Sequence, residues 1–401
     1  MINKLFPNLV AEVILSLQDV FRDGRPLDRV ILFRMKNNPK WGSRDRSFVA
    51  ESTFDIVRHW RRLWRHLEEE PALDIRSLYQ LFAVYWQLKG GELPAWKEFA
   101  GMKELWVPLQ EKDMKRAEWF SLQDEMDELG AAALGEDAWR TELEAMNRPA
   151  PVYLRVNTLK ASGYTVKKAL EEAEFPYMEL YENGPIKLMS KKHLNTHALL
   201  RSGLFEIQDV GSQMIAPFLQ VEPGMRVIDA CAGAGGKSLH LAALMNNRGR
   251  IISMDVEPRK LEELTRRTRK NGVSIVEPRL IDTTKVIKRL HEQADRLLLD
   301  VPCSGSGVIR RNPDSKYRVN KEYVERLLKV QEDILERYSS MLKPGGKMVY
   351  ATCSLFSVEN EGQVQKFLAR HPEFTLEEEK YIYPSEHDSD GFFMTRLLKK
   401  K

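Results

Sequence analysis

The chain has 401 residues, 43% of them hydrophobic, so it is long enough for two or three domains with sizeable cores. Its formal net charge is only +4, and its three widely separated cysteines exclude a disulfide scaffold and a paired-cysteine metal site. Neither a signal peptide nor an apolar run of membrane-spanning length is visible, so we expect a cytoplasmic monomer without a bound metal or a membrane partner.

Residues 1–145 are predicted to form a helical domain. Residues 43–67 repeat apolar side chains at helical spacing. Charge is unevenly distributed: residues 22–67 hold twelve Lys or Arg against five Asp or Glu, whereas residues 111–144 hold four against eleven. A basic block of this kind attracts phosphates, although a solvated helix face explains the same pattern.

Residues 146–222 are predicted to form a small α/β module. Pro149 and Pro151 interrupt the helical pattern, and alternating sequences follow. Strands are expected at 152–157, 186–190 and 204–209, with a helix at 165–175 and another from 210 toward a turn at 224.

Residues 223–401 alternate strands and helices, which predicts a Rossmann-like α/β fold with a doubly wound, mostly parallel sheet. Strands are expected at 225–230, 250–256, 277–282, 294–302, 347–354, 374–379 and 392–398. Helices are expected from about 238 and at 258–272, 322–342 and 358–370. The last two strands are expected to form an antiparallel edge.

The glycine-rich loop "DACAGAGGKS" fits neither of two common nucleotide-binding templates. A dinucleotide fingerprint starting at Gly233 and Gly235 needs a third glycine where Ser238 stands. A phosphate-binding P-loop would end in Gly-Lys-Ser, as here, but its first glycine is replaced by Cys231.

A third template, in which acidic residues end successive parallel strands, fits better. Asp229, Asp255, Asp282 and Asp300 end the first four strands of the domain, at the edge where such sheets bind ligands. Asp255 lies twenty residues past Gly235, where a carboxylate can bind ribose hydroxyls. A single such aspartate often only caps a helix, but four in register predict a nucleoside-type cofactor, S-adenosylmethionine. The residues expected to bind it are Cys231, Ala232, Gly233, Ala234, Gly235, Gly236, Lys237, Asp255, Asp282 and Asp300.

Two cysteines indicate the chemistry. Cys303 follows the fourth strand and Cys353 ends the fifth, so both are expected at the cofactor crevice. A thiolate that adds to carbon 6 of a pyrimidine makes carbon 5 nucleophilic enough to accept a methyl group. Asp300 is placed to hydrogen-bond or protonate N3, and a second cysteine could assist release. Spacing alone does not rank the two thiols, and Cys231 is expected to pack in the loop.

The motifs "DACAGAGGKS", "DVPCSGSG" and "YATCS" resemble those of the NOL1/NOP2/Sun family of RNA cytosine-5 methyltransferases, and the resemblance extends over about 150–401. It implies that Cys353 is the nucleophile and that Cys303 assists product release. One departure is Ala234, where the family has a proline, and a modest effect on cofactor affinity is expected. Lys237 is retained and is expected to hydrogen-bond Asp300 or the base.

RNA is the expected partner, since the target base must be unpaired or flipped to be reached. Arg155 and Asn157 of the small module, and Arg310 and Arg311 after Cys303, are candidate RNA contacts, although any single arginine can equally form a surface salt bridge. We expect a further set of residues to brace the module against the catalytic domain: Gln208, Asp209 and Ser212.

The sequence "GSRDRSFVAESTFDIVRHWRRL" resembles the helical, NusB-like domain of the bacterial small-subunit ribosomal RNA methyltransferase B group. That resemblance favours 16S-type ribosomal RNA as substrate. Three alternatives stay open: a transfer RNA cytosine-5 methyltransferase, a non-catalytic RNA-binding assembly factor and, more distantly, a P-loop nucleotide hydrolase.

Overall fold

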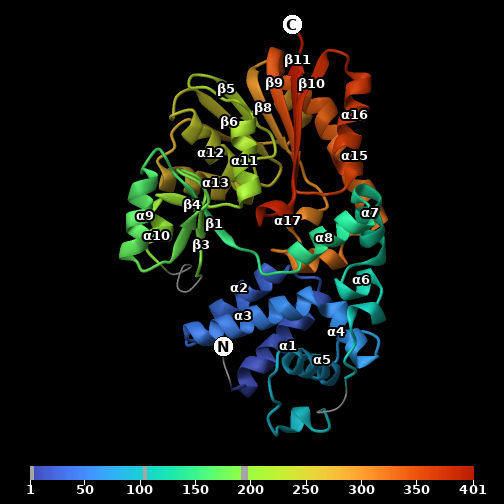
Figure 1. Cartoon of the computed structure of the whole chain (residues 1–401). Helices are drawn as coiled ribbons and strands as arrows, with labels where there is room; N and C mark the ends of the chain where they lie inside the picture. Colours follow the sequence, from blue (N-terminus) through green and yellow to red (C-terminus); the bar gives the residue numbers. More distant parts are fainter. Residues whose placement is uncertain (1–3, 103–105, 191–196) are drawn as a thin grey trace. The chain divides into compact units, whose positions relative to one another are not determined.

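The computed structural model describes residues 4–102, 106–190 and 197–401 (Figure 1). By its internal contacts the chain divides into two compact units. The helical unit comprises Met1–Asn147 with Ile309–Lys321, and the α/β unit comprises Arg148–Val308 with Glu322–Lys401. Within the described ranges, every helix falls short of the length and apolarity that crossing a membrane requires.

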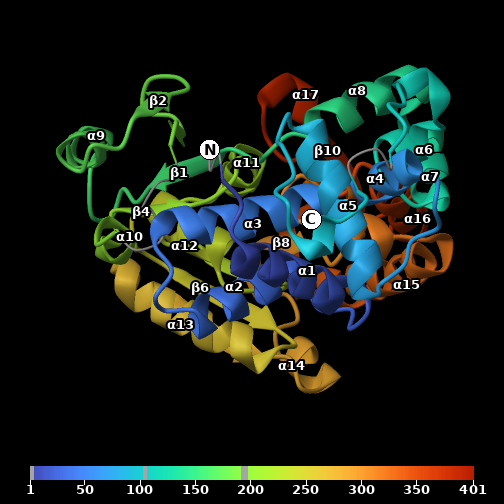
Figure 2. The ribbon, with the colours of Figure 1, turned by 90° about the horizontal axis from the view of Figure 1, so that it is seen from below.

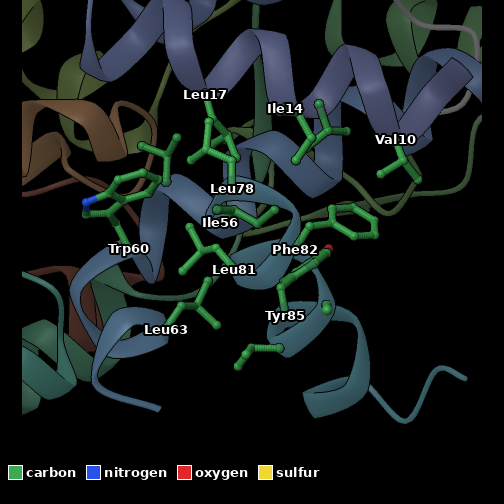
Figure 3. Close-up of a cluster of buried hydrophobic side chains, with 14 of the residues drawn as sticks. Val10, Ile14, Leu17, Ile56, Trp60, Leu63, Leu78, Leu81, Phe82 and Tyr85 are labelled. Carbon is green, nitrogen blue, oxygen red and sulfur yellow. The ribbon is translucent and has the colours of Figure 1, made fainter. Parts of the chain in front are cut away.

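The helical unit confirms the prediction that the N-terminal region is helical. Its α-helices are α1 (Pro7–Phe21), α2 (Leu27–Asn37), α3 (Ser43–Arg58), α4 (Trp60–Leu67), α5 (Ile75–Leu88), α6 (Arg116–Trp119), α7 (Asp124–Leu134) and α8 (Glu136–Met146). Figure 2 shows α1 running alongside α3. Their apolar faces meet in one core, part of which Figure 3 shows, from Val10 and Ile14 on α1 to Phe82 on α5.

The predicted helix over 43–67 is two helices that meet at His59. The backbone of His59 leaves helical geometry, with φ −114° and ψ 21°, so α3 ends at Arg58 and α4 begins at Trp60. The Trp60 ring stacks on Phe21 with ring centroids 3.7 Å apart. The break between α3 and α4 therefore lies next to a ring that packs in the core. Hydrophobic periodicity alone does not reveal such a break.

The segment Ile309–Lys321 is built into the helical unit although it follows Cys303 in sequence. Lys316 is fully buried there, and its ammonium donates to the carbonyl oxygens of Arg58, at 3.1 Å, and Phe120, at 2.9 Å, and to the side chain of Asn147. Tyr317 donates its hydroxyl to the carbonyl of Val57 at 2.7 Å. These contacts fix the segment among helices that precede it by some two hundred residues.

The α/β unit is centred on a seven-stranded sheet with the order β10-β11-β9-β8-β5-β6-β7. Its strands are β5 (Arg226–Asp229), β6 (Arg250–Asp255), β7 (Val276–Leu280), β8 (Ala294–Asp300), β9 (Leu342–Thr352), β10 (Phe374–Ile382) and β11 (Phe392–Lys399). β5 to β9 are parallel, and β11 pairs antiparallel with both β9 and β10; of these two antiparallel pairings, the one with β10 was predicted. The chain steps from β5 outward to β7 and then returns to β8 beside β5, which makes the β5–β8 boundary the switch point of the sheet.

Helices cover both faces of this sheet. The helices that accompany this sheet include α11 (Val210–Phe218), α12 (Gly236–Leu244), α13 (Pro258–Asn271), α14 (Thr284–Lys288), α15 (Lys321–Tyr338) and α16 (Glu361–Arg370). Leu297 and Leu299 on β8 face a core shared with α14, α15 and α16, whereas the intervening Leu298 faces α11 and α12. This alternation explains why β8 reads as a continuous apolar run.

A second, four-stranded sheet precedes the large one, in the order β2-β3-β1-β4. Its elements are β1 (Val152–Val156), α9 (Gly163–Glu172), β2 (Tyr177–Glu179), β3 (Ile186–Leu188), α10 (Leu199–Ser202) and β4 (Phe205–Ile207). β1 pairs antiparallel with β3 and β4 around its own small apolar core. β2 was not predicted, because its three residues show too little alternation of apolar and polar side chains to be recognised as a strand.

Candidate active site

The glycine loop joins β5 to α12 at the switch point of the sheet. Gly233 and Gly235 adopt left-handed backbone conformations, with φ of +54° and +84°. A Cβ atom on Gly235 would lie 2.0 Å from Cδ1 of Leu264, whereas one on Gly233 would meet no atom within 4 Å. Gly235 is therefore required for packing against α13, and the open space beside Gly233 leaves room for a ligand along the loop backbone.

Asp255, at the end of β6, holds this loop closed. Its Oδ2 accepts a hydrogen bond from the N–H of Gly233 at 2.9 Å, and its Oδ1 accepts one from Glu257 at 2.9 Å. Ala232 also donates to the carbonyl of Met254 at 2.8 Å. The predicted ribose-binding carboxylate thus lies against the loop, with remaining lone pairs for a further donor.

Asp229 is buried behind the loop. Its Oδ2 accepts a hydrogen bond from Ser238 at 2.6 Å, and Ser238 in turn accepts one from Ser253 at 2.8 Å. Burial raises the pKa of Asp229 to about 7, and the Ser238 hydrogen bond opposes that rise. This chain of contacts fixes the first turn of α12 to β5 and β6.

Lys237 and Asp300 form the polar centre of the crevice. Nζ of Lys237, in the first turn of α12, lies 2.5 Å from Oδ2 of Asp300 at the end of β8. Burial alone would lower the pKa of Lys237, but the charge of Asp300 and the hydrogen bond to it raise the pKa above its ordinary value. Lys237 therefore remains an ammonium ion, and the hydrogen bond expected from the sequence is present.

Cys303 and Cys353 lie side by side as free thiols, with their Sγ atoms 3.3 Å apart. Cys303 follows β8, Cys353 follows β9, and these two strands are parallel neighbours. The hydrogen bond with Cys353, reinforced by burial, raises the pKa of Cys303 well above its ordinary value. Cys303 is therefore a protonated thiol at neutral pH.

Two other predicted cofactor residues are placed differently from this centre. Cys231 packs against the core that β8 shares with α14, α15 and α16, as expected for a cysteine with a packing role. Burial raises the pKa of its thiol well above the ordinary value. Asp282 lies two residues beyond the end of β7 and is exposed. No three His, Cys, Asp or Glu side chains in the described ranges gather in a way that could hold a metal ion.

The structure gives Arg155 and Asn157 a bracing role instead of the predicted RNA contact. Arg155 is 6% exposed, and it donates to the carbonyl of Gly236 at 2.8 Å and to the side chain of Gln208. Asn157, 4% exposed, donates to the carbonyls of Gly203 at 2.8 Å and Asn271 at 3.0 Å. Both side chains are used to hold the small sheet against α12 and α13.

Arg310 and Arg311 belong to the helical unit. Arg310 is buried, and its carbonyl accepts a hydrogen bond from Arg58 at 2.9 Å, whereas Arg311 is half-buried. The burial of Arg310 argues against the phosphate contact predicted for it.

Bracing by the residues after β4 is present as expected. Oδ1 of Asp209 accepts hydrogen bonds from the N–H groups of Gly211, at 2.8 Å, and Asp390, at 3.1 Å, which lies beyond α16 in sequence. Gln208 donates to Ser212 at 3.0 Å.

Glu206, which was not predicted as a site residue, supports the glycine loop through Arg267. Glu206 pairs with Arg267 at 2.6 Å and with Lys270 at 2.7 Å, and Arg267 also donates to the carbonyl of Ala234 at 2.8 Å. Glu206 precedes these partners by about sixty residues, so no local pattern in the sequence indicates that they form ion pairs with it. Arg155 and Arg267 thus hold the backbone of the loop at two points, Gly236 and Ala234.

Glu359, which was also not predicted, lies buried beside the two cysteine loops. Its carboxylate accepts a hydrogen bond from the N–H of Ser304 at 2.8 Å and one from the hydroxyl of Ser354 at 2.5 Å. Ser304 and Ser354 directly follow the two cysteines in the sequence, but the stretch around Glu359 reads only as the start of a helix.

The chain matches two family models. The one described as "16S rRNA methyltransferase RsmB/F" matches residues 216–398, and the one described as "Methyltr_RsmF/B-like, ferredoxin-like domain" matches residues 129–184.

Curated relatives carry matching names. The chain is similar to a probable ribosomal RNA small subunit methyltransferase B of Bacillus subtilis, with 35% identity over 63% of this chain and 60% of the relative. It is also similar to the Synechocystis protein of the same name, with 30% identity over 73% and 70% of the two chains. The matched stretch thus spans less than two thirds of the Bacillus relative's length.

Among solved structures, the chain is similar to PH0851, with 25% identity, a TM-score of 0.85 and 99% of each chain covered. This likeness extends over both the helical and the α/β regions of the sequence, because it covers nearly the whole chain.

Proposed function

This chain belongs to the 16S rRNA methyltransferase RsmB/F family, and we propose that it transfers a methyl group from S-adenosylmethionine to carbon 5 of a cytidine in RNA. The observation that carries this proposal is the pair of free thiols 3.3 Å apart, at the ends of adjacent strands, beside an ion pair at the switch point of the same sheet. Carbon 5 of a pyrimidine needs a thiol nucleophile for methylation, whereas methylation of an exocyclic nitrogen does not.

The residues of the crevice fit S-adenosylmethionine. The open backbone at Gly233 suits a close approach by the amino-acid end, and Asp255 with Asp282 lies where ribose and adenine would be held. When bound there, S-adenosylmethionine supplies an electrophilic methyl group. The residues proposed to bind it are Cys231, Ala232, Gly233, Ala234, Gly235, Gly236, Lys237, Asp255, Asp282 and Asp300, with Cys231 acting by packing in the loop.

Cys353 is the proposed nucleophile. Its thiolate forms a bond to carbon 6 of the cytosine, which makes carbon 5 nucleophilic toward the methyl group. Asp300 assists this addition at N3, and Lys237 beside it supplies a proton to the pair. The resemblance of "YATCS" and "DVPCSGSG" to the family motifs supports this ranking of the two thiols.

Cys303 is proposed to act after methyl transfer. Once Cys353 is bound to carbon 6, its sulfur carries no charge, and the main cause of the raised pKa of Cys303 is removed. Cys303 then loses its own proton to solvent, and the resulting thiolate takes the proton from carbon 5. Loss of that proton restores the double bond between carbons 5 and 6 and breaks the bond between carbon 6 and Cys353.

The proposed substrate is 16S ribosomal RNA, in keeping with the names of the family and of the curated relatives. The helical region 1–145 and the module 146–222 are the proposed RNA-binding domains, and residues 223–401 the catalytic domain. Mapping 5-methylcytosine by bisulfite sequencing in a deletion strain tests this assignment. A site lost from 16S RNA supports it, whereas a site lost only from transfer RNA, or no lost site, would overturn it.

Two cysteine variants test the chemistry. Cys353→Ala is expected to abolish methyl transfer without forming any covalent complex with RNA. Cys303→Ala is expected to trap a protein–RNA adduct that survives denaturing electrophoresis. The reverse pattern would exchange the two roles, and binding of RNA without methyl transfer by the native chain would favour a non-catalytic assembly factor.

A further inference from the structure

Glu359 connects the backbones on which the two thiols are carried. It ends a short 3-10 turn, Ser357–Glu359, and is fully buried. Its Oε1 accepts hydrogen bonds from the N–H of Ser304 at 2.8 Å and from Nε2 of Gln331 at 3.0 Å. Its Oε2 accepts the hydroxyls of Ser304 and Ser354, the latter at 2.5 Å. One carboxylate therefore joins the residues that directly follow Cys303 and Cys353.

The surrounding hydrogen bonds reinforce this connection. The hydroxyls of Ser306 and Ser354 lie 3.0 Å apart, and Gly307 donates to the carbonyl of Cys353 at 3.0 Å. Gln331, on α15, donates to the carbonyl of Pro302 at 3.0 Å as well as to Glu359. A buried carboxylate is costly unless donors surround it, and a network whose members are satisfied holds a rigid geometry.

The contacts of Glu359 to the two loops are unequal. It holds Ser304 through both the backbone N–H and the side chain, but it holds Ser354 through the side chain alone. Ser354 is also fixed by the N–H of Phe356, which donates to its hydroxyl at 3.0 Å, and by Asn360, which donates to its carbonyl at 3.0 Å. Loss of the carboxylate therefore loosens the Cys303 loop more than the Cys353 loop.

We propose that Glu359 is a positioning residue that holds Cys303 against Cys353 and so sets the rate at which the covalent RNA adduct is resolved. This inference rests on the proposed function, since it concerns the step that follows methyl transfer. Glu359 touches neither sulfur in the described contacts; it holds the two loops through Ser304 and Ser354, and its charge also contributes to the raised pKa of Cys303. A displacement of about 1 Å at a reacting group is enough to slow a step about a hundredfold.

A purely structural role would have different consequences. A carboxylate that only stabilises the fold would, when removed, lower the amount of folded protein and leave the partition of the adduct unchanged. A carboxylate that positions Cys303 would, when removed, shift that partition toward unresolved adduct. The ratio of trapped adduct to released methylated RNA therefore separates the two roles.

The test compares Glu359→Gln with the native chain on a 16S ribosomal RNA transcript, using radiolabelled S-adenosylmethionine and denaturing electrophoresis. The amide keeps an acceptor for the Ser304 N–H but offers Ser304 and Ser354 a donor where they had an acceptor. We expect turnover to fall about tenfold to a hundredfold, with methylated adduct accumulating as in Cys303→Ala. Glu359→Ala, which removes every acceptor, is expected to trap at least as large a fraction of the adduct.

Gln363→Ala is the matched control. Gln363, on α16, is 2% exposed and donates to the carbonyl of Leu328 at 2.8 Å and to the side chain of Gln331 at 3.3 Å, but in the described contacts it bonds neither to Glu359 nor to the two cysteine loops. It is expected to lower the melting temperature without trapping adduct. If Glu359→Gln lost turnover only in proportion to its folded fraction, with no adduct, the proposal would be overturned.

Two further outcomes keep the test decisive. If the Glu359 variants do not fold, Ser304→Ala removes one of the same bonds, and adduct must accumulate in it for the proposal to stand. If Cys303→Ala itself traps no adduct while the native chain methylates RNA, the proposed chemistry fails, and the positioning role fails with it. Adduct in Cys303→Ala but none in the Glu359 and Ser304 variants would refute the positioning role alone.

Discussion

The ammonium of Lys237 lies 2.5 Å from the carboxylate of Asp300, across the gap between the first turn of α12 and the end of β8. The two residues are brought together because β5, which leads into α12, is the parallel neighbour of β8. A paired carboxylate and ammonium at this point can accept and deliver the proton that addition to a pyrimidine ring requires.

Asp300→Asn is expected to lower kcat about 10²-fold to 10⁴-fold, the usual contribution of a proton-transferring group, with little change in the KM for RNA. Lys237→Gln is also expected to lower kcat, because it removes the proton held beside Asp300. Steady-state methylation assays measure both constants.

The control for this ion pair lies at the other end of the same strand. Nζ of Lys343 pairs with Asp295 at 2.6 Å, at the start of β8. Lys343→Gln is expected to leave kcat unchanged, since the pair is remote from the crevice. Equal losses in Lys343→Gln and Lys237→Gln would show that the ion pair at Asp300 matters only for folding.

The pKa of Cys303 is expected to depend on Cys353. The hydrogen bond between the thiols is the largest cause of the raised pKa of Cys303, ahead of burial. Cys353→Ala removes that cause, so the pKa of Cys303 falls and more thiolate is present at neutral pH. Alkylation of Cys303 by iodoacetamide is therefore expected to become several-fold faster in the variant, as measured by peptide mass spectrometry across a range of pH.

Cys231 serves as the internal reference in that experiment. Burial holds its pKa high in the native chain, and Cys353 is not among the main causes. Its alkylation rate should not change in Cys353→Ala. An unchanged rate at Cys303 would contradict the coupling of the two thiols and, with it, the proposed ionisation of Cys303 after adduct formation.

Much of the sheet and the centre of the site could be predicted, because both follow from local patterns. Strands that alternate with helices imply parallel pairing, and parallel pairing places the carboxyl ends of neighbouring strands together. These patterns alone predict that Asp300, Cys303 and Cys353 lie at one edge of the sheet. The antiparallel pairing of β10 with β11 was predicted, but the insertion of β11 between β9 and β10 was not.

The residues that escaped prediction are those whose partners lie far along the chain. Arg155 reads as a surface arginine in a short strand, yet it is buried against Gly236, 81 residues away. Glu359 reads as a helix start, yet it binds Ser304, 55 residues earlier. Likewise, no periodicity indicates that Ile309–Lys321 packs among the N-terminal helices. Contacts of this kind depend on tertiary packing, which local sequence patterns do not encode.

Ala234 stands where the family that the motifs resemble has a proline. Placing a proline there is expected to stiffen the glycine loop. The carbonyl of Ala234 already accepts a hydrogen bond from Arg267, and proline retains that acceptor. Ala234→Pro is expected to raise the free energy of unfolding by about 0.4–1 kcal/mol, because the unfolded chain loses conformational freedom. Calorimetry should also show modestly tighter binding of S-adenosylmethionine. Lower stability together with weaker binding would show that the backbone around Gly233 does not accommodate proline.

Glu206 is expected to make the α/β unit sensitive to acid. Burial alone would raise the pKa of Glu206, but the charge of Arg267, with hydrogen bonds from neighbouring residues of α13, lowers it to about 2 from an ordinary value of 4.5. A carboxyl whose pKa is depressed on folding stabilises the folded state above its unfolded pKa, and loses that contribution as the pH falls toward its folded pKa. The contribution is about 3 kcal/mol at neutral pH and disappears between about pH 4.5 and pH 2.

Glu206→Gln tests this directly. Urea unfolding at neutral pH should show a loss of about 3 kcal/mol relative to the native chain, and the difference should shrink as the pH is lowered toward 2. Glu263→Gln is the matched control, because Glu263 pairs with Arg266 on the exposed side of the same helix, and such pairs contribute at most about 1 kcal/mol. A difference between Glu206→Gln and the native chain that stayed constant with pH would show that Glu206 stabilises the unit by packing and not by charge.

Glu206 is also expected to affect the binding of S-adenosylmethionine, because its partner Arg267 holds the carbonyl of Ala234 in the glycine loop. If Glu206 acts by its charge, Glu206→Gln weakens that binding. Glu263→Gln should leave it unchanged.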